Sequence, residues 1–104
     1  MAPSEIAAGL SVIAAGFVGT GGNVVRSGGG PVHVDKEATG KYHIIFDQAL
    51  ASVPVVVATS DGGPKGSFAR ITETTVNGFK IEGRDYAAHG LADIGFSFMV
   101  AKLA

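Results

Sequence analysis

The side chains of this sequence that could bind a metal ion are its three histidines, His33, His43 and His89. Asp35 follows His33 by two residues, so in a strand both side chains point to the same face. Imidazole and carboxylate groups are common zinc ligands, but this spacing matches no recognised ligand pattern. A histidine on a solvated strand face is more often a surface residue, so we expect neither a metal ion nor a cofactor.

Groups for covalent or acid–base catalysis are also sparse. The chain has no cysteine and no Gly-x-Ser-x-Gly motif, and a nucleophilic serine needs a base within hydrogen-bond reach. Asp35, Asp47, Asp85 and Asp93 lie where predicted strands begin or end, and turn formation explains aspartate at such positions. No helix-forming run follows the glycine clusters, as a phosphate-binding loop would require. We expect that the protein is not an enzyme.

The segment best suited to recognition runs from Gly83 to Gly90, with the sequence GRDYAAHG. It combines an aromatic residue, two charges and a histidine between two predicted strands. An aromatic face packs on sugar C–H groups while charged side chains hydrogen-bond hydroxyls. An ordinary polar surface loop has the same composition, so both interpretations stay open.

The elements that position these residues are predicted to be strands. Glycine, proline and asparagine interrupt the sequence at short intervals, and no segment has apolar residues at helical spacing. Tyr42, Ile44 and Phe46 alternate with their neighbours, as does the segment 93–102, and Asn77-Gly78 predicts a tight hairpin. The sequence therefore predicts an all-β protein, an antiparallel β-sandwich of about six to eight strands. These strands are expected near 10–18, 24–26, 32–35, 41–47, 54–59, 67–74, 79–82 and 93–102.

Composition indicates one domain, residues 1–104, because cores of about 100 to 150 residues are the commonest. Hydrophobic residues make up 46% of the chain and charged residues only 16%. The core of so small a domain cannot bury all of these hydrophobic residues, and the apolar surface that remains favours a buried interface between subunits. The net charge of −1 gives no reason to expect nucleic acid as a partner.

The apolar segment 6–18 could pass for the core of a signal peptide. Residues 1–5 are acidic where a signal peptide is basic, and the segment is too short to span a bilayer. We therefore interpret it as a first strand and expect no insertion into a membrane.

Five features of the segment 35–102 recur together in a known family: a strand ending at Phe46, a loop closing at Pro54, Ala69-Arg70-Ile71, the hairpin Asn77–Lys80 and an alternating C-terminal strand. With these features, residues 35–102 resemble the H-type lectin domain, and the first 30 residues are expected to add one or two strands. The chain also looks like the glycine-rich modules at the receptor-binding tips of phage tail fibres and other virion proteins.

The resemblance implies a ligand and an assembly. Members of the family form trimers or hexamers and bind N-acetylgalactosamine-like sugars between neighbouring subunits. The sugar-binding acid of the family falls on Asp35, and its aromatic residue falls on Tyr86 in place of the usual tryptophan. Gly66 occupies the place of the family's basic residue, so Lys65 is the nearest substitute. The family's histidine falls on Ala87, so His89 joins the candidate set because it lies on the polar segment 83–90 and not through the resemblance.

Two functions are compatible with this sequence. The first is a non-enzymatic trimeric module for adhesion, which binds a cell-surface glycan through loops at one end of the sandwich. The second is a structural virion or assembly protein, such as a fibre tip or decoration protein, whose partners are its own copies and a host particle. Both predict a homotrimer or hexamer located outside the cell or on a virion surface.

Overall fold

The computed structural model describes residues 10–63, 65–85 and 90–103, without the side chains of Leu10, Arg26 and Leu103. This part of the chain contains strands and no helix, hence no helix that could cross a membrane. The strands are β1 (Leu10–Val18), β2 (Val24–Gly29), β3 (Val32–Ala38), β4 (Lys41–Phe46), β5 (Val55–Ser60), β6 (Ser67–Thr75), β7 (Gly78–Asp85), β8 (Gly90–Leu91) and β9 (Phe96–Leu103).

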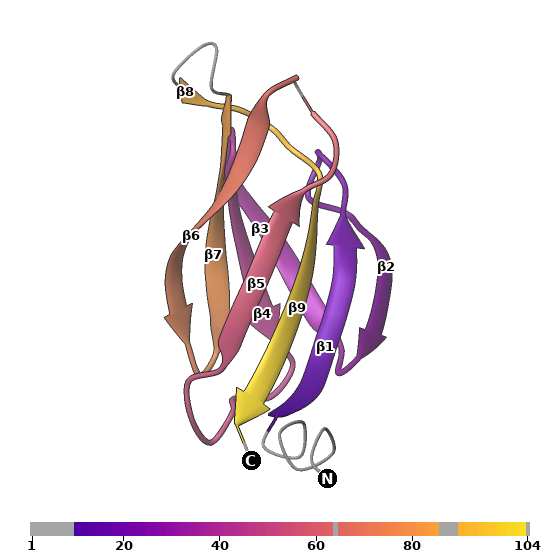
Figure 1. The fold of residues 1–104 in the computed structure, drawn as a ribbon, viewed down its shortest axis with the longest axis vertical. Coiled ribbons are helices and arrows are strands. Elements are labelled where there is room, and N and C mark those ends of the chain that lie inside the picture. The colour runs from indigo at the N-terminus through magenta and orange to yellow at the C-terminus, as the bar shows by residue number, and fades with distance from the viewer. Residues whose placement is uncertain (1–9, 64, 86–89, 104) are drawn as a thin grey trace, which may run out of the picture.

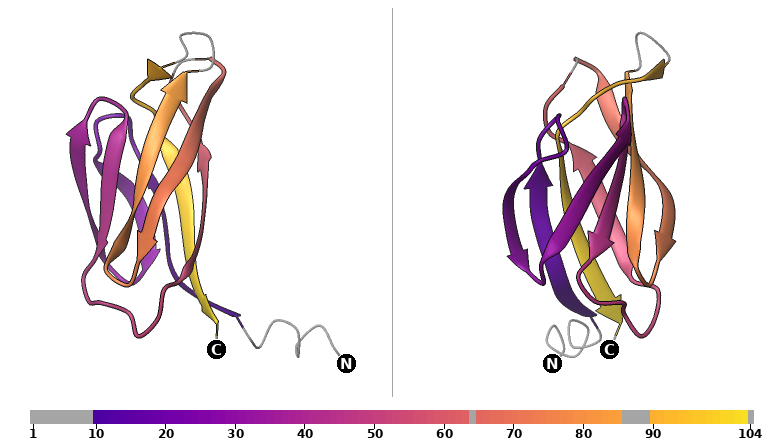
Figure 2. Two further views of the ribbon diagram at one scale, coloured as in Figure 1. Left: turned by 90° about the vertical axis from the view of Figure 1, so that its left-hand side faces the viewer. Right: turned by 180° about the vertical axis from the view of Figure 1, so that it is seen from behind.

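The strands form two sheets packed face to face (Figures 1 and 2). Sheet A has the order β2-β1-β9-β5 and lies nearer the viewer in Figure 1. Sheet B has the order β3-β4-β7-β6, with the short β8 paired to β7. All neighbouring strands are antiparallel. The prediction of an antiparallel β-sandwich is confirmed, and β1 and β2 are the strands that the first 30 residues contribute.

The core lies between the sheets and follows the alternation of the sequence. Tyr42 and Ile44 of β4 meet Phe96, Phe98 and Val100 of β9, and these side chains are at most 4% exposed. The ring of Tyr42 packs edge-on against Phe96 with centroids 5.3 Å apart, an arrangement that aromatic pairs favour. Alternate residues of the strands therefore face away from the core, except where register shifts interrupt the alternation, as between Val12 and Ala14 of β1 and between Ile71 and Glu73 of β6.

The boundaries of four strands differ from the prediction by three residues, and the short β8 was not predicted. β2 continues to Gly29, β3 to Ala38 and β7 to Asp85, whereas β9 begins at Phe96. Residues 93–95 leave the ladder because Gly95 bonds the β5–β6 connection: its carbonyl accepts from Asp61 N at 2.7 Å and its N–H donates to Gly62 O at 3.1 Å. Polar residues at strand ends hid these extensions in the sequence.

The predicted hairpin at Asn77-Gly78 is present, but its turn lies one residue earlier. Thr75 pairs with Gly78, so the two-residue loop is Val76-Asn77 and Gly78 belongs to β7. Glycine is required at position 78 by close approach, because a Cβ there would lie 2.1 Å from the carbonyl oxygen of Ile44. The glycine therefore serves sheet packing and not the conformation of the turn.

Candidate functional site

Asp35, the predicted sugar-binding acid, lies on β3 at one edge of sheet B, on the face turned away from the core. It is exposed, and its Oδ1 lies 2.9 Å from Nε2 of His33, which is also exposed. His43 occupies the paired position on β4, and its Nδ1 lies 3.9 Å from Oε2 of Glu37. In the described part of the chain, no group of three or more His, Cys, Asp or Glu side chains could hold a metal ion.

The other predicted binding residues do not join Asp35 in the described structure. Lys65 is exposed in the connection between β5 and β6, and β6 lies at the edge of sheet B opposite β3. Tyr86 and His89 lie outside the described residues. Within one chain the structure therefore places Asp35 and Lys65 apart, and a site that used both would have to combine neighbouring copies.

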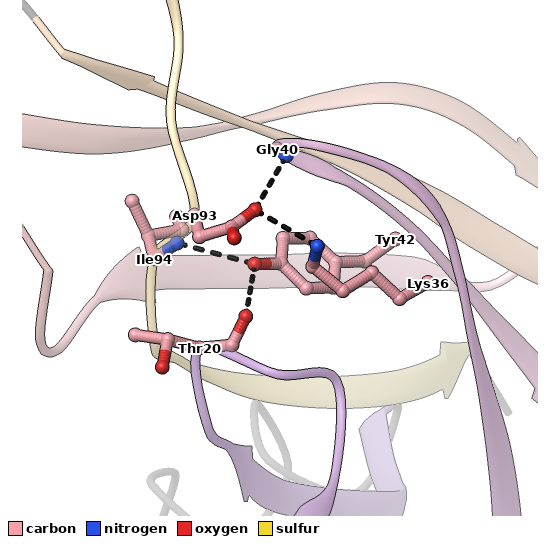
Figure 3. Close-up of polar contacts among 6 residues, drawn as sticks. All are labelled: Thr20, Lys36, Gly40, Tyr42, Asp93 and Ile94. Carbon is pink, nitrogen blue, oxygen red and sulfur yellow. Dashed lines mark hydrogen bonds and ion pairs between the residues drawn. The ribbon is translucent and has the colours of Figure 1, made fainter.

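A buried hydroxyl joins the two sheets at the end of the sandwich near β8 (Figure 3). Tyr42 of sheet B donates its phenol proton to the carbonyl of Thr20, in the β1–β2 turn, over 2.7 Å. The same oxygen accepts from the backbone N–H of Ile94 at 3.2 Å. Burial raises the pKa of the Tyr42 phenol, and the nearby carboxylate of Asp93 raises it further, whereas the Ile94 bond opposes the rise. The neutral hydroxyl is thus the stable form.

Asp93 anchors the neighbouring β3–β4 turn. Its Oδ1 accepts from the N–H of Gly40 at 2.9 Å and lies 3.1 Å from Nζ of Lys36. The Gly40 bond, followed by the interaction with Lys36, lowers the pKa of the Asp93 carboxyl. Residues of both sheets and of the β8–β9 connection meet here (Figure 3). The Tyr42 hydroxyl and Oδ1 of Asp93 are both held by structural partners, so we interpret this cluster as a contact that stabilises the fold.

The outer face of sheet A is apolar across β1, β9 and β5. Register and alternation place seven apolar side chains and two hydroxyls on this face. Four of the apolar side chains are well exposed: Val12 56%, Val55 48%, Val57 51% and Met99 40%. None of the described side chains on these outward positions is charged. The outward residues are Val12, Ala15, Phe17, Val55, Val57, Thr59, Ser97, Met99 and Ala101.

Two shallow hollows mark the middle of this face, and Ser97 lines both. One has a volume of about 250 Å³ and includes Val57 and Met99; the other, of about 260 Å³, includes Ala15 and Phe17. At the rim, Ser97 Oγ lies 3.4 Å from Oδ2 of Asp61. The face therefore combines exposed apolar side chains with shallow depressions between them.

An apolar pocket of about 220 Å³ opens at the end of the sandwich away from β8, between β1 and the β4–β5 connection. Its apolar lining includes Ile13, Val32, Phe46 and Leu50, and among the described residues Asp47 is the one ionisable residue that lines it. A single carboxylate without a neighbouring base or nucleophile provides no catalytic arrangement. The pocket could take a small apolar group but has no convergent polar groups that would select one.

Sequence reasoning predicted surplus apolar surface but did not locate it. The hydrogen bonds of the Tyr42 hydroxyl were also missed, although a tyrosine in a core strand must find a partner for its O–H.

Models of protein families, curated proteins and solved structures were compared with this chain, and none of them matches it. The resemblance to H-type lectins and fibre tips therefore stays a prediction, and the functional argument depends on the geometry of the fold.

Proposed function

We propose that the protein is a non-enzymatic building block that assembles with copies of itself through the outer face of sheet A. The observation that carries this proposal is the apolar character of that face, described above. Water-exposed valine and methionine side chains gathered on one sheet face are typical of a surface that another surface covers. An assembly would remove this apolar area from water and gain the corresponding free energy.

The two faces of the sandwich differ in a way that supports this assignment. The outward positions of sheet B are rich in charge on all four long strands, and several of these charges pair with one another. Charged side chains are well hydrated, so a charged sheet face is stable in contact with water and does not have to be buried by another surface. The contrast therefore supports sheet A, and not sheet B, as the side that the proposed assembly covers. The charged outward residues of sheet B include Asp35, Glu37, Lys41, Arg70, Glu73, Lys80, Glu82 and Arg84, and His33 and His43 lie among them.

The size of the face is sufficient for a specific interface. The three strands β1, β9 and β5, spaced by about 4.8 Å and each of about eight residues rising by about 3.3 Å, cover a plane of roughly 14 Å by 26 Å. A standard interface removes about 800 Å² of accessible surface from each partner. Side chains that protrude from such a plane make its accessible surface larger than its flat area, so the accessible surface of this face is of the same order as the area that one partner buries.

The occupant that fits best is a second copy of this chain. The described outward side chains of β1, β9 and β5 carry no charge, and the strand register places Arg26 of β2 beside Phe17 at the margin of the face. The centre of the face therefore gives no electrostatic selection for a different protein, and the shallow hollows beside Ser97 leave room for apolar side chains of a second copy. Homo-oligomers with closed symmetry are the commonest assemblies of small domains. For the number of copies, we propose the trimer that the resemblance implies. We also propose a role in an extracellular or virion-surface assembly, because a chain with few charges and an all-β fold suits a repeating structural unit.

Carbohydrate binding through Asp35, Lys65, Tyr86 and His89 stays a second candidate function. The favouring observation is that Asp35 is exposed and already oriented by His33, as a carboxylate that accepts sugar hydroxyls would need to be. In an oligomer, Lys65 of one copy could approach Asp35 of the next. A glycan array tests this candidate: the unaltered protein should bind a sugar that Asp35→Asn does not bind. No binding by the unaltered protein, or equal binding by the two proteins, would contradict it.

The assembly is tested by placing one charge on sheet A. We expect the unaltered protein to have a mass in light scattering that is a multiple of 10.5 kDa, and Met99→Glu to reduce it to a single chain. The control Thr72→Glu places the same charge on an exposed position of sheet B and should leave the mass unchanged. Circular dichroism should show both variants folded.

Either of two results would contradict the proposal. One is a single-chain mass for the unaltered protein at concentrations well above micromolar. The other is an oligomer whose mass and dilution behaviour Met99→Glu does not change while Thr72→Glu does, since that would move the interface to sheet B.

A further inference from the structure

Beyond the assembly, the outer face of sheet B carries an aromatic side chain among charges. Phe68 of β6 is 42% exposed although the core offers apolar partners, and Leu91 of β8 is 39% exposed. Arg84 of β7 lies between them, because it pairs with Phe68 on one side and with Leu91 on the other. We call Phe68, Arg70, Glu82, Arg84 and Leu91 the aromatic–basic patch.

We propose that the aromatic–basic patch binds an anionic saccharide, a sugar ring that carries a carboxylate. Phe68 would take the ring face, and Arg70 would pair with the carboxylate. Glu82 and Arg84 would bond hydroxyl groups. This site differs from the residues that the resemblance implied, and it lies on the face that the proposed assembly leaves in water.

The strand register fixes the geometry of the patch. Phe68 pairs with Arg84 and Arg70 pairs with Glu82, so the four side chains occupy the corners of a rectangle on one face. Its sides are about 5 Å across the strands and about 7 Å along them. A pyranose ring has similar dimensions, so one ring can rest on Phe68 and still reach the three polar corners.

The polar corners are partly ordered before any ligand arrives. Oε1 of Glu82 accepts from Nε of Arg84 at 3.3 Å and from its Nη2 at 2.9 Å. Both bonds end on one carboxylate oxygen, which leaves Oε2 of Glu82 for a ligand hydroxyl. Such pre-ordering lowers the entropy cost of binding.

Arg70 supplies the charge that selects an anion. Its guanidinium has no hydrogen-bond or ion-pair partner among the described residues, although it lies on an exposed strand position beside Glu82. Arginine presents a planar fork that matches a carboxylate with two parallel bonds. Because Glu82 and Arg84 neutralise one another, the patch keeps one positive charge, and a neutral sugar would not use it.

A polar hollow of about 130 Å³ borders the patch on the side of β4. Glu82 lines both the hollow and the patch, and Lys41 pairs with Glu82 from β4, opposite Arg70. Thr72 adds a hydroxyl to the lining. A second sugar unit, or a substituent of the first, can extend into this hollow, where Lys41 and Lys80 lie beside Glu37 and Glu82 and offer groups of both charges to hydroxyls.

The test uses two probes that differ only in the carboxylate: methyl β-D-glucuronide and methyl β-D-glucoside. In a ¹H–¹⁵N NMR titration at low ionic strength, the glucuronide at millimolar concentration should shift the amide resonances of residues 68–70 and 82–84. The glucoside should bind at least about tenfold more weakly, because it lacks the charge-assisted pair with Arg70.

Two variants and one control complete the experiment. Arg70→Gln and Phe68→Ala should each weaken glucuronide binding by about tenfold or more, whereas Lys102→Gln, an exposed position on sheet A, should not change it. Dispersed spectra show that each variant is folded. The proposal is overturned if the glucuronide causes no shifts at tens of millimolar, if both probes bind equally, or if Arg70→Gln binds as the unaltered protein does. Light scattering on the same samples reports the assembly separately, so failure here leaves that proposal standing.

Discussion

Replacing Tyr42 with phenylalanine removes one oxygen atom from the core and nothing else. In the fold that oxygen donates to Thr20 O at 2.7 Å and accepts from Ile94 N at 3.2 Å. The ring of a phenylalanine would keep the edge-on contact with Phe96. The variant therefore isolates the two hydrogen bonds that join the sheets near β8.

The cost of Tyr42→Phe follows from what each lost partner can do. Thr20 is exposed, so water can replace the phenol at its carbonyl with little loss. Ile94 has no exposed surface, so its N–H would be left without any acceptor, which costs about 1–3 kcal/mol. We therefore expect the free energy of unfolding to fall by about 2 kcal/mol, a large part of the total of about 5–15 kcal/mol for a natural domain.

The assay is urea denaturation of both proteins at one chain concentration, because assembly makes apparent stability depend on concentration. Thr72→Val removes an exposed hydroxyl and should change the free energy of unfolding by less than about 0.5 kcal/mol. If Tyr42→Phe is as stable as this control, Ile94 finds another acceptor and the hydrogen-bonded cluster does not join the sheets as we describe.

Three further predictions concern stability. The folded state lowers the pKa of the Asp93 carboxyl from its ordinary 3.8, so the carboxylate stabilises the fold at neutral pH and loses this effect as the pH falls below that value. In thermal denaturation at pH 7, Asp93→Asn should be less stable than the unaltered protein by no more than about 1 kcal/mol. In strong acid the two proteins should be equally stable. A pH-independent difference would contradict this assignment. Gly78→Ala places a methyl group 2.1 Å from Ile44 O and should cost about 3 kcal/mol or more, whereas Gly28→Ala meets no atom within 4 Å and should be tolerated; equal urea midpoints would refute the close approach. Phe79→Ala empties a site in the middle of the core and should cost about 3–5 kcal/mol in the same assay, and a loss below about 1 kcal/mol would show that Phe79 is not a central core residue.

The fold could be predicted because its information is local. Alternation at Tyr42 and Ile44, and again along β9, marks which side chains face the core, and a period of two specifies a strand without knowledge of its partners. Phe68 shows the limit of such reasoning: the mixed pattern of β6 did not reveal that this aromatic side chain faces outward.

Features that depend on pairing over long sequence distances were not predictable. The apolar face of sheet A is assembled from β1, β9 and β5, whose neighbours in space are far apart in the chain. The contact of Asp93 with Gly40 likewise joins residues 53 positions apart. Composition indicated that apolar surface would be left over, but only the strand order shows that it gathers on one face.

The most direct test of the central claim measures which faces meet in the assembly. The chain has no cysteine, so a spin label can be attached at Thr59→Cys on sheet A or, as a control, at Thr72→Cys on sheet B, and distances between copies can be measured by electron paramagnetic resonance. Packed sheets lie about 10 Å apart, so labels at position 59 should couple strongly between copies and labels at position 72 should be much farther apart. Stronger coupling at position 72, or none at position 59, would contradict assembly through sheet A.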